Sequence, residues 1–195
     1  MEWLITCVDR VIDDVTSKRC NQVGLWVHAV CTKSAANAFS YFDAFVESLD
    51  LIEFEIELGG IPGFDAEQVR SAMQLEIAPP MPPPFDTAWC AISYGKGTHD
   101  GFALERFDDP ERISKMVEEL SDTTSTQISR ESHRMIERIS GLACELISSR
   151  LPLSCKSTLC GPLARETAIW LATVGGGLAV IDGHWFDPIE MRWLE

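Results

Sequence analysis

The feature that most restricts the fold is a run of three glycines at 175–177, near the C-terminal end of the sequence. Residues 162–174 before it are typical of a helix, and residues 178–181 after it are continuously apolar, which indicates a buried strand. A phosphate-binding loop precedes a helix, because the amides at a helix N-terminus point at the anion. Glycines that follow a helix instead favour a C-cap and a flexible entry into the next element. We therefore expect an architectural hinge here.

The rest of the chain alternates between the two periodicities of regular structure. Together with 178–181, the expected strands are 25–30, 52–58, 88–94 and 101–107. Together with 162–174, the expected helices are 3–15, 35–49 behind an N-cap at Ser34, 65–77, 110–120 behind Asp109-Pro110, and a long one with an apolar stripe over 135–147 that Pro152 ends. The strand at 52–58 shows strict alternation of apolar residues with glutamates.

These elements predict an α/β (α+β) fold with a mixed sheet of about five strands flanked by five or six helices. A strand, a helix and the strand at 52–58 in succession suggest a β-α-β unit, although a sheet with one exposed face fits as well. We expect one domain over 1–195, with a proline-rich connection at 78–85 between two halves.

The net charge of −14, from 30 acidic and 16 basic residues, restricts the partners of the chain. Phosphates and anionic membrane surfaces would be repelled, so we expect neither nucleic acid nor membrane binding. A basic protein partner is favoured, and an acidic surface kept for solubility is the alternative. The absence of a basic, apolar leader and of paired cysteine motifs predicts a cytoplasmic protein with reduced thiols, a Cys155–Cys160 disulfide being the other possibility.

The acidic residues are concentrated where basic residues are absent. Between Lys33 and Arg70 the sequence has eight acids and no lysine or arginine. Asp43 and Glu47 fall on one exposed helical stripe, which Asp50 continues. The predicted strand adds a row of three: Glu53, Glu55 and Glu57. This patch predicts a surface complementary to a cationic partner, with an ordinary solvated face as the alternative.

No catalytic, metal or cofactor motif stands out. The turn at 182–188 would lie at the edge of the sheet and present Asp182, His184 and Asp187, a weak cluster for which a surface turn is the favoured interpretation. Nucleophilic chemistry would need Cys155 or Cys160 near His184, and nothing in the sequence brings them together. We expect no cofactor and no metal.

The run AIWLATVGGGLAVID at 168–182 resembles a pattern found in small bacterial immunity proteins of polymorphic toxin systems. The resemblance implies a cytosolic, non-enzymatic protein that binds and blocks one cognate toxin, often a basic nuclease. The expected contacts are the acids of 43–57 and, as a second region, Asp182, His184 and Asp187. An acidic secretion chaperone and a small enzyme using the His184 turn or the Cys155/Cys160 loop are the alternatives, and the chain is expected to be a monomer or a homodimer.

Overall fold

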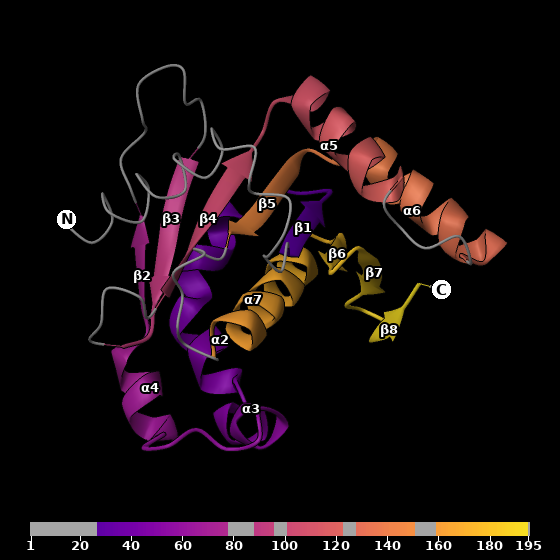
Figure 1. Ribbon diagram of the computed structural model, residues 1–195. Helices are drawn as coiled ribbons and strands as arrows, with labels where there is room; N and C mark the ends of the chain where they lie inside the picture. Colours follow the sequence, from indigo (N-terminus) through magenta and orange to yellow (C-terminus); the bar gives the residue numbers. More distant parts are fainter. Residues whose placement is uncertain (1–26, 78–87, 96–100, 123–127, 151–158, 195) are drawn as a thin grey trace, which may run out of the picture.

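The computed structural model describes residues 27–77, 88–95, 101–122, 128–150 and 159–194 (Figure 1). Within these ranges eight strands form one sheet in the order β2-β3-β4-β5-β1-β6-β7-β8, and every neighbouring pair is antiparallel. The strands are β1 (Val27–Cys31), β2 (Gln74–Ile77), β3 (Ala88–Ser93), β4 (Gly101–Phe107), β5 (Glu145–Arg150), β6 (Leu178–Ile181), β7 (His184–Asp187) and β8 (Arg192–Trp193). The helices are the 3-10 helix η1 (Ala36–Tyr41) and α2 (Phe42–Ser48), α3 (Leu51–Glu57), α4 (Ala66–Ala72), α5 (Pro110–Asp122), α6 (Arg130–Leu142) and α7 (Cys160–Val174). A single mixed α/β domain is confirmed, but about five strands is too few.

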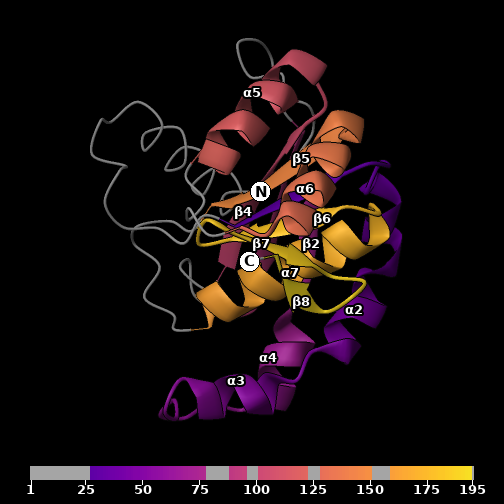
Figure 2. The same ribbon diagram turned by 90° about the vertical axis from the view of Figure 1, so that its right-hand side faces the viewer.

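Helices cover both faces of the sheet. Alternate side chains of a strand point to opposite faces, so on β1 Val27 and Ala29 belong to one core cluster and Val30 to another. The first cluster packs under α7 and α2, and the second packs under α5 and α6. Helices α3 and α4 project beyond one end of the sheet (Figures 1 and 2).

The glycine run forms the junction between α7 and β6, with the helix C-cap that the sequence predicts. Gly175 is the C-cap of α7, and the N–H of Gly177 donates to Ala172 O at 2.8 Å. Gly176 has a φ of +61°, a conformation that glycine adopts without strain. The chain then pairs β6 with β1. The expected helix 162–174 and strand 178–181 are both confirmed, and the helix begins two residues earlier.

The predicted strand at 52–58 is wrong, because residues 52–57 lie in helix α3 and Leu58 is its C-cap. Leu51 and Phe54 are buried while Ile52 and Ile56 are 61% and 74% exposed, so the buried spacing is helical. The carboxylate of Asp50 accepts the N–H of Glu53 at 2.9 Å and begins the helix. An acid at the N-cap with glutamate three residues later is a capping-box pattern, which is the signal that outweighs the alternation.

The β-α-β unit also fails, since no described strands pair in parallel. The helix expected over 35–49 is divided into η1 and α2, and Ser34 is not its cap. The N–H of Ala35 instead donates to the buried carboxylate of Glu145, which also pairs with Arg106 Nε. This carboxylate joins the start of η1 to β5 and β4.

Two expected helices end earlier than predicted because a strand follows each. Residues 65–77 divide into α4 and β2, and the long helix ends at Leu142 before β5. Leu146 and Ile147 lie in different core clusters on opposite faces of the sheet, as neighbouring residues of a strand do. The apolar stripe predicted over 135–147 therefore covers the end of α6 and the beginning of β5. The strands 88–94 and 101–107 and the cap at Asp109 are confirmed. The expected helix at 3–15, the connection at 78–85 and Cys155 lie outside the described residues.

Candidate protein-binding site

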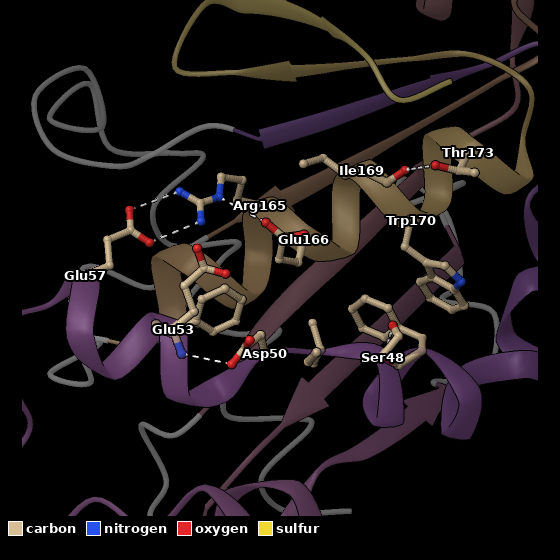
Figure 3. A pocket seen from close by; sticks show the side chains of 12 residues that line it. Ser48, Asp50, Glu53, Glu57, Arg165, Glu166, Ile169, Trp170 and Thr173 are labelled. Atoms are coloured by element: carbon tan, nitrogen blue, oxygen red, sulfur yellow. Dashed lines mark hydrogen bonds and ion pairs between the residues drawn. The ribbon is translucent and has the colours of Figure 1, made fainter. Parts of the chain in front are cut away.

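A groove of about 500 Å³ lies between α7 on one side and α2, the α2–α3 turn and α3 on the other (Figure 3). Phe45 of α2 and Trp170 of α7 stack at its apolar end, with ring centroids 4.5 Å apart and planes inclined by 14°. Phe54 and Leu49, both buried, line the groove nearby. Stacked aromatic pairs of this kind add about 0.5–1.5 kcal/mol beyond their burial. They fix the position of α2 against α7.

The other end of the groove is charged. Arg165 of α7 reaches across to α3, where its Nη1 and Nη2 lie 3.3 Å from the two carboxylate oxygens of Glu57. Its Nε donates to Glu166 at 3.2 Å. Partial burial lowers the pKa of Arg165, but the hydrogen bonds that its guanidinium donates to Glu57 and Glu166 outweigh this effect, and the pKa is raised above its ordinary value. The groove therefore already holds one guanidinium in a two-point carboxylate contact.

The carboxylates in this groove outnumber its basic groups. Among the described residues, Asp50, Glu53, Glu57 and Glu166 line it and Arg165 is the one basic lining residue, so these five side chains carry a formal charge of −3. The side chain of Glu53 points from α3 toward α7 (Figure 3), and no ion pair to it occurs within the described ranges. The groove therefore keeps unneutralised negative charge beside an aromatic surface.

The structure divides the predicted acidic patch. Asp43 and Glu47 are exposed on α2, but they do not line the groove. Glu53 and Glu57 are four residues apart on α3 and both line it, whereas Glu55 is half-buried on another face of the helix. The three glutamates thus do not form the single row that a strand would give.

The second predicted region, the 182–187 turn, is a hairpin between β6 and β7. Asp182 and Gly183 have φ of 52° and 79°, so they form the two-residue turn that Asp-Gly favours. Asp187 is 5% exposed, and its Oδ1 accepts the N–H groups of Ile189 and Glu190. Its carboxylate therefore holds a turn within the chain.

His184 is exposed on β7 and meets the ring of Trp193 edge-on at 6.3 Å. None of Asp182, His184 and Asp187 lines the groove. The structure thus separates the two regions proposed for partner contact.

The residues of the enzyme alternative are also far apart. The Cys160 thiol donates to Gly101 O of β4 at 3.5 Å and is buried, whereas His184 belongs to β7. These strands are four positions apart in the sheet, which places them roughly 19 Å from each other. Across the described ranges no three His, Cys, Asp or Glu side chains are grouped as metal ligands would be.

Sequence reasoning missed the α7 side of the groove. Arg165, Glu166 and Trp170 belong to a helix that is otherwise mostly apolar. Two adjacent charged residues in such a helix indicate a face that is exposed to solvent. Their proximity to α3 depends on contacts more than 100 residues apart in sequence, which periodicity cannot reveal.

Among the described helices, none has the length and apolar character required to cross a membrane. Comparison of the chain with models of protein families, with curated proteins and with solved structures finds no match.

Proposed function

We propose that this protein is a non-enzymatic binding protein whose acidic surface takes up a basic protein partner, and more specifically an immunity protein that occludes a cognate toxin. The supporting observation is the surface of α2, α3 and α4. Seven of the eight acids between Lys33 and Arg70 are exposed, and only Glu55 is half-buried. In the described part of the chain Glu57 is the one of these eight that forms an ion pair.

A cationic partner relieves the repulsion within this surface. Asp43 with Glu47, and Glu53 with Glu57, are like charges four residues apart on their helices, each pair costing a few tenths of a kcal/mol. A complementary partner neutralises them and gains steering over a Debye length of about 8 Å at physiological salt. Occlusion of a toxin needs no catalytic group.

The secretion-chaperone alternative has a different support. Ile189, Met191 and Trp193 are exposed at and beside β8, the edge strand of the sheet, with 71%, 70% and 45% of their surfaces accessible. An exposed apolar edge can pair with a second chain. Because an immunity protein can also be a homodimer, oligomeric state alone does not separate the proposals: the chaperone is favoured if light scattering shows a dimer that Trp193→Lys dissociates and the protein fails to neutralise a neighbouring toxin.

The direct test is neutralisation of a toxin. A toxin-domain protein encoded by an adjacent gene should lose its growth inhibition when this protein is co-expressed, and the pair should bind in calorimetry. Reversing charge in Asp43→Lys/Glu47→Lys/Glu53→Lys should weaken binding at least tenfold. The matched control reverses three exposed acids of α5, on the opposite face of the sheet: Glu111→Lys/Glu118→Lys/Asp122→Lys. Equal affinities for the two variants, or no protection, would refute the proposal.

A further inference from the structure

We infer that the groove between α3 and α7 captures an arginine side chain of the partner, between the carboxylates of Asp50 and Glu53 and the aromatic surface of Trp170. The inference rests on the proposed function and assigns the contact to one site on the acidic surface. It goes further because it names one contact within this surface: Asp43 and Glu47, which belong to the same surface, lie outside the groove.

The geometry of Arg165 shows which cation the rim accommodates. Its guanidinium meets both oxygens of Glu57 through two separate nitrogens, while a third nitrogen meets Glu166. A planar group with several fixed donors makes such contacts, and an ammonium does not, because its charge is a single point. Glu57 and Glu166 of this groove thus already hold a guanidinium.

One arginine does not saturate the site. Glu57 and Glu166 are engaged by Arg165, whereas Glu53 has no ion pair within the described ranges. The Asp50 carboxylate accepts the N–H of Glu53 at the start of α3, and a carboxylate has further lone pairs for a second donor. A second guanidinium entering here would reduce the formal charge of the groove from −3 to −2.

The aromatic wall favours the same occupant. Trp170 is half-buried, lines the groove and is held in place by the Phe45 stack. Phe45 covers one face of the Trp170 ring, so an incoming arginine packs against the remaining surface of that ring, a contact that arginine makes more often than lysine. A volume of about 500 Å³ is within the range of sites that bury a compact ligand, and it is ample for one extended side chain.

A second hollow continues the acidic surface on the far side of the α2–α3 turn. It holds about 490 Å³, shares Ser48, Leu49 and Asp50 with the groove, and adds Glu67. Arg70 lies in this hollow, but its guanidinium donates to Val46 O and Leu49 O and so leaves Glu67 unpaired by it. The partner segment is therefore expected to carry a further basic residue on the side of the captured arginine that faces this hollow.

The test uses the full chain, ¹⁵N-labelled, with hexa-arginine, hexalysine and hexacitrulline peptides as probes. Hexa-arginine should shift the Trp170 indole N–H resonance, identified by its absence in Trp170→Phe, and should bind at least fivefold more tightly than hexalysine. Hexacitrulline, which keeps the shape and lacks the charge, should not bind. An unmoved Trp170 resonance at saturation, or equal affinity for arginine and lysine, would overturn the inference.

Matched neutral substitutions locate the contact. Asp50→Asn/Glu53→Gln should weaken hexa-arginine binding about tenfold, and asparagine keeps the α3 cap. Asp43→Asn/Glu47→Gln removes the same charge outside the groove and should change affinity less than twofold. Equal losses would show diffuse attraction and refute the site. If the groove fails while a cognate toxin still binds and is sensitive to the charge reversals, the inference alone is wrong; if no toxin is bound, the proposed function is.

Discussion

Replacing Gly177 by alanine should destabilise this protein, because the added methyl group would collide with the backbone of a neighbouring strand. An added Cβ would lie 1.8 Å from Val30 O and 2.8 Å from Val30 C, both backbone atoms of the central strand β1. Gly177 has no positive φ, so the cost is purely steric. Gly141 in α6 is the opposite case, because nothing lies within 4 Å of its added Cβ.

The magnitude follows from how far β1 and the start of β6 must separate. Real Cβ atoms do not approach carbonyl oxygens within about 3 Å, so the contact must open by more than 1 Å next to the Val30–Leu178 pair. Overpacking of this kind costs about 1–3 kcal/mol, and weakening one or two ladder hydrogen bonds adds about 1 kcal/mol each. A smaller unfolded-state gain offsets part of this, leaving about 3 kcal/mol.

Urea unfolding followed by circular dichroism at 222 nm measures the difference. Gly177→Ala should lower the free energy of unfolding by about 3 kcal/mol and the Tm by about 6–12 °C for a chain of this size. Gly141→Ala should raise the free energy by about 0.5–1 kcal/mol, since alanine is the better helix former. An unchanged midpoint for Gly177→Ala would show that β6 does not enter the sheet against Val30 in the way the structure describes.

Three further outcomes are expected. Glu145→Ala should cost about 2–3 kcal/mol, because it leaves the Ala35 N–H and the Arg106 guanidinium without their buried acceptor; the exposed control Glu118→Ala should stay within about 0.5 kcal/mol, and similar urea midpoints would contradict the pairing. Burial raises the pKa of Cys31 and Cys90 to about 12, so iodoacetamide at pH 8 should label exposed Cys144 and spare those two until urea is added, as peptide mass mapping will show. Phe54→Lys should unfold the α3 region and lower the Tm, whereas Ile56→Lys should change stability by less than about 0.5 kcal/mol; comparable losses would support a strand.

Elements whose signals are local could be predicted from the sequence. The glycine run after 162–174, the pair of strands at 88–94 and 101–107, and the Asp109-Pro110 cap each depend on residues within one or two turns. Each is found in the structure at nearly the predicted bounds. In these cases tertiary contacts add to a local preference and do not oppose it.

The failures occur where two local signals compete. In 51–58 the apolar residues fit period 2 at Ile52, Phe54, Ile56 and Leu58, and the helical spacing i, i+3, i+7 at Leu51, Phe54 and Leu58. The Asp50 cap and burial against the core select the helix, and only the second of these is tertiary. The Asp182-Gly183 hairpin was equally visible in the sequence, as Asp-Gly between apolar residues. A hairpin at these two residues implies a strand after the turn, which is β7. The interpretation of 182–188 as a turn alone did not include this strand.

Only the acidic side of the candidate site could be predicted from the sequence. The acids of 43–57 are evident from composition, but the groove exists because Arg165 and Trp170 of α7 meet α3 and α2. The order of the strands in the sheet determines which helices come into contact. The sequence had suggested a parallel unit, and the antiparallel order that brings α7 across β1 was not deducible from periodicity.

The position of the acids along their helices makes it possible to distinguish their contribution to folding from their contribution to binding. Five of the eight carboxylates occupy helix N-termini, where negative charge and an acceptor oxygen stabilise the first turn: Asp43, Asp50, Glu53, Asp65 and Glu67. Capping requires the acceptor and not the charge, because asparagine caps about as well as aspartate. A charge-neutral isostere should therefore preserve the helix and abolish attraction for a cation. If Asp50→Asn/Glu53→Gln retained full stability yet lost hexa-arginine binding, the charge would be in excess of what folding needs, and unchanged solubility of the variant would then favour a cationic partner over a solvating role.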